Sequence, residues 1–248
     1  MRTKEERLLF FILPSLAIVL FIFLVFIAAF SYEGGNRIDP QSVGYSFSNN
    51  YLSDLGRLKT VAGVPNTIPF YCFNGALIIL SAIFSFYFLY LPSLYDDDER
   101  VQNISRLGSL CGLLASFCFA GVAYTPADLF FSAHVFFADW LYRLMNLTIF
   151  FYAISFIIMP KKHFALSLVF GFISLIVSSH IILSDFGLAD LFSEPHIIRV
   201  LSQKAATIAL VFSVPLMTIH NRKRIESHPL SLSPFAISNL FLFIKNFK

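Results

Sequence analysis

The chain has 248 residues, of which 57% are hydrophobic and only 13% are charged, with a formal net charge of +3 and a mean hydropathy of +0.73. Soluble domains carry roughly 25% charged residues, so the composition excludes an ordinary water-soluble protein. The chain also contains 31 phenylalanines, which 18 basic and 15 acidic residues cannot shield from water. We therefore expect lipid to cover much of its surface.

Six continuous apolar runs dominate the sequence. Helical runs of about 20 apolar residues match the roughly 30 Å hydrocarbon layer of a bilayer. None of the six alternates over about ten residues, so helices rather than barrel strands are predicted. We predict an all-α, six-helix transmembrane bundle formed by residues 1–220, with an outer loop at 31–69 and spans at 8–30, 70–91, 107–124, inside 126–159, 164–183 and 197–219.

The basic residues predict the orientation of the bundle. The first run is about 23 residues long, against 7–15 in a signal peptide, so a retained span is expected. Lys and Arg favour cytoplasmic segments. With the N-terminus inside, the outer segments hold only Arg37, Arg57 and Lys59, and the inner segments hold Arg2, Lys4, Arg7, Arg100, Arg106, Lys161, Lys162, Arg222, Lys223, Arg224, Lys245 and Lys248. Both termini are predicted to be cytoplasmic, in a plasma or inner membrane.

Two spans carry further patterns. In the third, Gly108, Gly112, Ser116 and Ala120 recur every four residues, which predicts close packing of a central helix. Thr125 and Pro126 predict the start of the fourth span by a capping pattern. On a helix beginning there, one polar side is formed by Asp128, Ser132, Asp139, Arg143 and Asn146, and Asp139 and Arg143 are spaced for an ion pair.

Polar residues of several spans share the predicted outer level, whereas acids, bases and histidines at the inner level are few. Interfacial snorkelling and ion pairing would explain this pattern, as would an outward-facing pocket. In the second interpretation, the outer loop near Asp54 closes over the polar level and neutralises part of its positive charge. The predicted pocket residues are Asp54, Asn74, Asp128, His134, Asp139, Arg143, His180, Arg199 and Lys204.

Catalytic and cofactor motifs are absent from the sequence. It has no GxSxG elbow, glycine-rich phosphate loop or CxxC pair, so we expect no cofactor and assign no catalytic residue. His134, His180 and His196 lie near the predicted outer surface and would be the ligands if a zinc ion were bound. No HxxxH or HExxH pair supports that site.

The first outer loop contains Asn50-Tyr51-Leu52-Ser53-Asp54-Leu55-Gly56, and the second span opens with Phe73-Asn74. With the turn at Pro126 and Asp128, the His134-bearing span, and Glu194 and Arg199 before the last span, this region resembles the membrane family known as domain of unknown function 998, related to the Frag1/DRAM/Sfk1 group. The resemblance covers about 45–219. It implies six spans and no particular reaction.

Residues 221–248 are predicted to form a cytoplasmic tail whose amphipathic segment, from Pro234 onwards, lies on the membrane surface. Three functions follow from the sequence. The first is non-enzymatic binding of a lipid head group or a partner subunit in the outer pocket. The alternatives are an intramembrane metal-dependent lipid hydrolase and a proton- or ion-coupled transporter using Asp139, Arg143 and Lys204. Membrane lipids are the expected partners, with a membrane protein as a second class and no nucleic acid.

Overall fold

The computed structural model describes residues 2–96, 98–159 and 163–227. Within these ranges, six helices are long and apolar enough to cross a membrane, and the only β-type pairings are isolated bridges in the first loop. The predicted all-α six-span bundle is confirmed. The chain is a multi-pass membrane protein.

The first span runs without a break through α1 (Arg2–Arg7), a π-helical turn η1 (Leu8–Ile12) and α2 (Leu13–Phe30). Pro14 has no N–H for the preceding turn, and the wider π turn lies at this point. The other spans are α3 (Thr67–Tyr90), α4 (Glu99–Tyr124), α5 (Phe131–Ile158), α6 (Phe164–Asp185) and α7 (Pro195–Ser227). Short 3₁₀ turns are η2 (Leu52–Gly56), η3 (Leu91–Leu94) and η4 (Leu188–Leu191).

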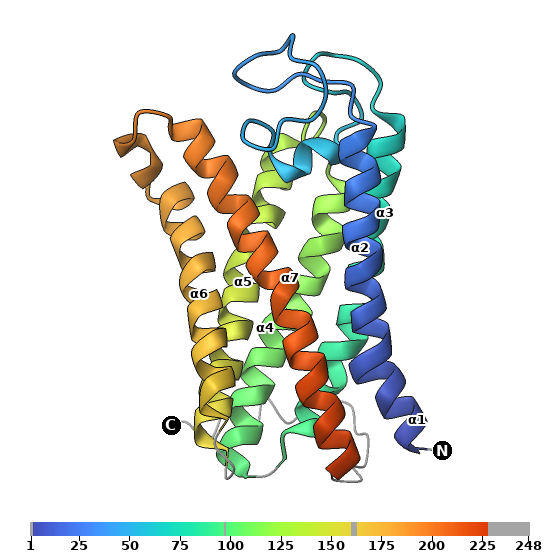
Figure 1. Ribbon diagram of the computed structural model, residues 1–248, viewed down its shortest axis with the longest axis vertical. Helices are drawn as coiled ribbons and strands as arrows, with labels where there is room; N and C mark the ends of the chain where they lie inside the picture. The colour runs from blue at the N-terminus through green and yellow to red at the C-terminus, as the bar shows by residue number, and fades with distance from the viewer. Residues whose placement is uncertain (1, 97, 160–162, 228–248) are drawn as a thin grey trace.

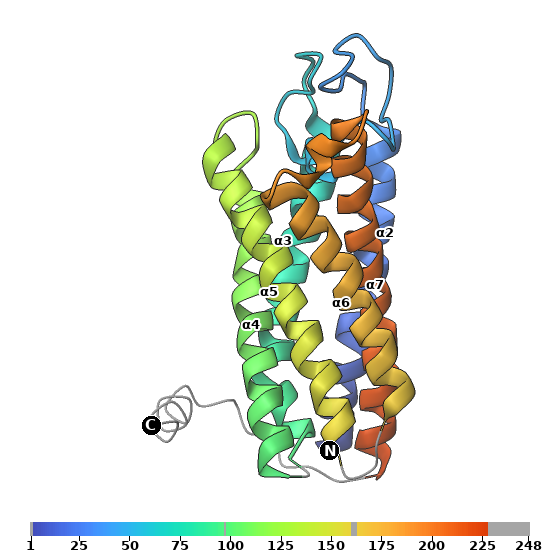
Figure 2. The same cartoon turned by 90° about the vertical axis from the view of Figure 1, so that its left-hand side faces the viewer.

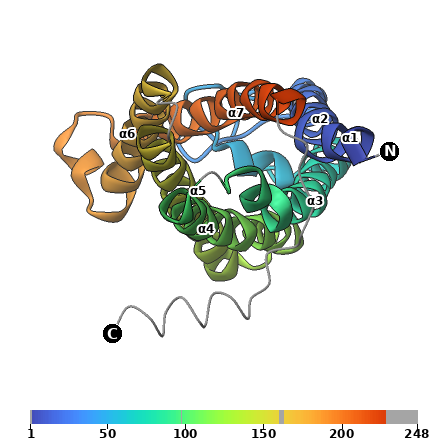
Figure 3. The same cartoon turned by 90° about the horizontal axis from the view of Figure 1, so that it is seen from below.

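The six helices form a closed ring in chain order, in which α7 returns to α2 (Figure 3). Both ends of the described chain lie at one end of the bundle, with α1 and the end of α7 side by side (Figure 1). Their cytoplasmic location stays a prediction. Residues 221–227, expected in the tail, belong to α7, and the predicted amphipathic segment lies outside the described residues.

The predicted close packing of α4 is confirmed. A Cβ on Gly112 would lie 2.6 Å from the ring of Phe88 on α3, and one on Gly108 would lie 3.1 Å from Tyr152 on α5. These glycines let the aromatic rings of both neighbours approach the α4 backbone. The expectation that α4 is central is wrong, because α4 is one wall of the ring between α3 and α5.

The predicted start of the fourth span is also wrong. Thr125 follows the end of α4, and its hydroxyl donates a 2.7 Å hydrogen bond back to the carbonyl of Gly121. A turn over 126–130 comes next, and α5 begins at Phe131. Asp128 therefore lies in this turn and is not part of a polar helix side.

Residues 31–66, which we call the lid, lie over the end of the bundle opposite to both chain ends (Figure 2). The lid contains η2, and the buried Leu55 of that turn belongs to the main hydrophobic core. The lid thus packs as part of the folded bundle.

Candidate functional site

The lid is held on one side by α7. Three α7 side chains bond to nearby backbone groups of the lid. His196 donates to the carbonyl of Asn49 (2.7 Å), Lys204 donates to the carbonyl of Asn50, and Gln203 accepts from the amide of Leu52 (2.9 Å). None of these bonds involves a lid side chain, so the lid is recognised through its backbone.

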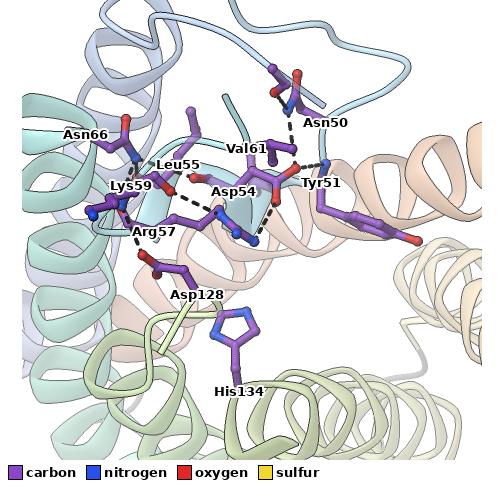
Figure 4. Close-up of polar contacts among 12 residues, drawn as sticks. Asn50, Tyr51, Asp54, Leu55, Arg57, Lys59, Val61, Asn66, Asp128 and His134 are labelled. Carbon is purple, nitrogen blue, oxygen red and sulfur yellow. Dashed lines mark hydrogen bonds and ion pairs between the residues drawn. The ribbon is translucent and has the colours of Figure 1, made fainter. Parts of the chain in front are cut away.

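The opposite side of the lid is held by α3 and by the turn before α5. Asn74 on α3 donates a 3.0 Å hydrogen bond to the carbonyl of Gly56. The two carboxylate oxygens of Asp128 accept from the amides of Leu58 (3.1 Å) and Lys59 (2.9 Å) (Figure 4). Asn74 and Asp128, both predicted as pocket residues, are therefore supports of the lid.

The Ser53-Asp54-Leu55-Gly56 segment has a structural role at three of its four positions. Asp54 accepts from the Tyr51 amide (2.9 Å), which caps the η2 turn. Leu55 is fully buried, and Gly56 lies so close to α3 that a Cβ there would be 2.7 Å from Phe73. Ser53 and Asp54 also line the cavity beneath the lid.

Asp54 is 2% exposed, and burial raises the pKa of its carboxyl group. A hydrogen bond from the side chain of Asn50 (3.3 Å) and the positive charge of Arg57 lower the pKa and so oppose part of this rise. The ion pair with Arg57 measures 3.9 Å. The ion-pair partner of Asp54 is thus Arg57 of the lid itself, and among the predicted basic residues of the spans its negative charge acts on Lys204.

A cavity of about 240 Å³, which we call the outer cavity, lies between the lid and helices α5, α6 and α7. Its wall combines apolar residues with several charged and polar side chains. Five of the nine predicted pocket residues line it, namely Asp54, His134, Asp139, His180 and Arg199. Asn74, Asp128, Arg143 and Lys204 do not.

His134 provides an unused hydrogen-bonding atom at this cavity. Its Nδ1 lies 2.7 Å from the carbonyl of Thr125, which can only accept, so Nδ1 carries the proton. In the neutral ring, Nε2 is then an acceptor. His134 is 4% exposed, and its Nε2 has no hydrogen-bond partner among the described residues. The ring points toward Asp54 and Arg57 (Figure 4).

Ion pairs surround the cavity on the α5 and α6 side. Arg143 forms the predicted pair with Asp139 at 3.8 Å, but its closer partner is Asp185, whose Oδ2 accepts from Nε (3.1 Å) and Nη2 (2.8 Å). Arg199 pairs with Asp190 at 2.7 Å. The charged lining residues and their ion-pair partners comprise four aspartates and four arginines, so their formal charges cancel. The lining residues are Asp54, Asp139, Asp185, Arg37 and Arg199, and their further partners are Arg57, Arg143 and Asp190.

The three candidate zinc ligands are not brought together. The lid carbonyl of Asn49 occupies Nε2 of His196, and the hydroxyl of Ser202 lies 2.9 Å from Nδ1 of His180. Among the described residues, no group of three His, Cys, Asp or Glu side chains has the arrangement of a metal site. The hydrolase alternative built on His134, His180 and His196 is therefore wrong in its ligand set.

Sequence reasoning missed several residues of the site. Arg37 lines the cavity from the lid, over the rings of Tyr51 (5.2 Å) and Phe131 (5.5 Å), and no periodic pattern marks it in the sequence. Gln203 also lines the cavity, and its polarity inside an apolar span was an available signal.

The end of the bundle opposite to the lid, which was predicted to be the inner end, is also polar, contrary to expectation. Glu6 and His220 are buried there. Buried Asn221 accepts from the hydroxyl of Tyr95 (2.8 Å) and donates to that of Tyr87 (3.0 Å). These bonds join α7 to α3 and to the segment that follows it.

Comparisons with protein-family models, curated proteins and solved structures gave no match. The resemblance to domain of unknown function 998 therefore stays a prediction. The functional assignment depends on the chemistry of the residues described above.

Proposed function

We propose that this membrane protein binds a lipid without transforming it and holds the polar head group in the outer cavity. The observation that carries the proposal is the buried Nε2 of His134, which has no hydrogen-bond partner among the described residues and belongs to a side chain lining the cavity. A buried acceptor is costly to leave unsatisfied, so a ligand hydroxyl or ammonium group would stabilise this arrangement. None of the hydrogen bonds that hold the lid uses Nε2 of His134, so this atom is available to the ligand.

The charge of the outer cavity narrows the class of head group. Because the surrounding aspartates and arginines are equal in number, a net charge on the ligand would have no uncompensated partner there. A neutral hydroxylated or zwitterionic head group suits this lining best. Arg199 and Asp139 both line the cavity and offer a donor and an acceptor to the two charged parts of a zwitterion.

The size of the cavity also favours a head group. Pockets for whole drug-sized molecules run from about 300 to 1,000 Å³, and the outer cavity has about 240 Å³. It accommodates the polar part of a lipid but not its chains. A membrane-protein partner seated on the lid is the other occupant suggested by the sequence, and it would leave this enclosed space unused.

With the predicted topology, the lid and the cavity face outward from the cytoplasm, in a plasma or inner membrane. Asp139 lines the outer cavity and pairs with Arg143, whereas Lys204 lies outside this cavity. This separation favours binding over the transporter alternative, in which the three side chains act together.

Lipid retention in detergent tests the proposal. Wild type and His134→Leu are purified in a mild detergent, and the retained lipids are extracted and identified by mass spectrometry. We expect wild type to retain a neutral or zwitterionic lipid and the variant to retain about two- to tenfold less, the value of one lost hydrogen bond.

The matched control is Ser132→Ala, because Ser132 lies on the same helix, is exposed and does not line the cavity. It should retain as much lipid as wild type. Equal retention by His134→Leu, or no retained lipid in wild type, would contradict the proposal.

A further inference from the structure

A second hollow lies on the side of the bundle between α2 and α7, and we call it the α2–α7 groove. It has a volume of about 780 Å³ and is lined mainly by apolar side chains of the two helices. Several of these are largely exposed on the outer face of the spans, including Val19, Phe26, Ile208 and Phe212. Since these helices cross the membrane, the groove opens sideways into hydrocarbon.

At the end of the groove that lies toward the described chain ends, α2 and α7 are linked by a hydrogen bond. There the hydroxyl of Ser15 on α2 donates a 3.4 Å hydrogen bond to Thr218 on α7. Figure 1 shows α7 crossing toward α2 at this end and diverging from it toward the lid. At its other end the groove is lined by Tyr45, Phe47 and Leu52 of the lid.

The length of the groove along its helices is comparable to the thickness of one leaflet. Its α7 lining extends from Lys204 to Pro215 and its α2 lining from Ser15 to Ala29, which correspond to about 16 Å and about 21 Å at roughly 1.5 Å per residue. Half of a hydrocarbon layer of roughly 30 Å is about 15 Å. A single acyl chain of the leaflet on the lid side would fill this length.

The lid end of the groove carries a buried cation. Lys204 is 4% exposed and lines the groove, and its Nζ lies 5.4 Å from the ring of Tyr45 and 5.2 Å from that of Phe47. Its one hydrogen bond among the described residues goes to the carbonyl of Asn50. An ammonium group can donate three.

No carboxylate of the described residues forms an ion pair with Lys204, whereas Arg57, Arg143 and Arg199 each have one. The negative charge of Asp54 acts on Lys204, but the two side chains form no ion pair because Asn50 lies between them: its carbonyl accepts from Lys204, and its side chain donates to Asp54. A buried charge needs a counter-charge or further hydrogen bonds to offset its desolvation. Among the described residues no carboxylate lines the groove, so a direct ion-pair partner for Lys204 there would come from a ligand.

We infer that the α2–α7 groove binds one acyl chain of an anionic lipid, whose phosphate or carboxylate pairs with Lys204. The aromatic rings of Tyr45 and Phe47 shield this pair from water at the lid end. This site differs from the charge-balanced outer cavity in location, in lining and in the sign of its ligand, so it does not depend on the proposed function.

Quenching by brominated lipids tests this inference. Trp140 is the only tryptophan of the chain, so Trp140→Phe provides a background for single reporters. Phe212→Trp places the reporter in the groove, and Phe172→Trp places a control on α6, because both phenylalanines are 63% exposed and only Phe212 lines the groove. Each protein is reconstituted into phosphatidylcholine vesicles that contain either brominated phosphatidylglycerol or brominated phosphatidylcholine.

We expect the groove reporter to be quenched by phosphatidylglycerol at about one fifth of the mole fraction needed for phosphatidylcholine, since one basic residue near the membrane surface contributes about a fivefold preference. The α6 reporter should show no preference. Lys204→Met should remove the preference and Lys204→Arg should keep it. If Lys204→Met does not fold, Lys204→Gln retains a donor for the Asn50 carbonyl without the charge.

Equal quenching by the two lipids at the groove reporter would overturn the inference, as would a preference that survives in Lys204→Met or Lys204→Gln. His134→Leu should leave the preference unchanged, because His134 does not line the groove. The proposed lipid sites in the groove and in the outer cavity can therefore be refuted independently of each other.

Discussion

Replacing Gly56 by alanine probes how tightly the lid is fixed to the bundle. The added Cβ would lie 2.7 Å from Cδ1 of Phe73 and 2.8 Å from Oδ1 of Asn74, both on α3. Both distances are well inside van der Waals contact, so the side chains of Phe73 and Asn74 or the backbone of η2 must shift. Asn74 also donates the hydrogen bond to the Gly56 carbonyl, and a shift would lengthen it. Overpacking of this kind costs about 1–3 kcal/mol.

The matched control is Gly75→Ala, at the position next to Asn74 on α3. A Cβ at Gly75 meets nothing within 4 Å, and alanine is favoured over glycine in a helix by about 1 kcal/mol. The control should therefore be neutral or stabilising. The two variants make the same chemical change, one in η2 and one in α3, and only Gly56→Ala is expected to lower stability.

Thermal unfolding in detergent measures the difference. The three cysteines are free and lie in spans, so a thiol-reactive dye reports their exposure on unfolding. With about 2–4 °C per kcal/mol for a chain of this size, Gly56→Ala should melt about 2–12 °C below wild type. If Gly56→Ala has the same melting temperature as wild type and Gly75→Ala, the lid is not held against α3 as described.

Three further predictions concern charge and orientation. Asp185→Ala should lower the melting temperature more than Asp139→Ala, because Asp185 accepts two close hydrogen bonds from Arg143, and both losses should stay below about 1 kcal/mol since the pairs are partly exposed. The raised pKa of Asp54 means that its stabilising contribution is complete below the unfolded pKa of about 3.9 and is lost as the pH rises through the folded pKa. Asp54→Asn should flatten stability against pH in that window, and an unchanged pH profile would refute the assignment. In intact cells, Asp96→Cys in a cysteine-free background should not react with a membrane-impermeant maleimide, whereas a lid cysteine should, and the reverse pattern would invert the topology.

The spans were predictable because the bilayer constrains length and polarity together. The error at the fourth span has a physical reason. The turn over 126–130 contains Leu129 and Phe130, so hydropathy does not fall where α4 ends and α5 begins. Thr125 and Pro126 suit a helix start, but Thr125 bonds back to α4 instead. Hydropathy therefore fixed the number of spans better than their ends.

The polar level at the lid end was predictable, whereas its division into two sites was not. Lys204 and Gln203 are adjacent in sequence, yet Gln203 lines the outer cavity and Lys204 lines the groove. The division depends on where the lid places Asn50 and Leu52 against α7. Loop backbone contacts of this kind leave no periodic pattern. The ion pair of Asp139 with Arg143 was predictable from helix spacing, but the closer pair with Asp185 needs the approach of α6 to α5.

Protection of a cysteine in the outer cavity tests the central claim most directly. Ser53 lines the cavity, whereas Val43 is 95% exposed on the lid. In a cysteine-free background, Ser53→Cys and Val43→Cys are labelled with a water-soluble maleimide, in detergent alone and after adding total lipid extracted from the expressing cells. We predict that lipid slows the labelling of Ser53→Cys severalfold and leaves that of Val43→Cys unchanged, because the bound head group occupies the cavity. Equal labelling rates for Ser53→Cys with and without lipid would contradict a lipid site beneath the lid.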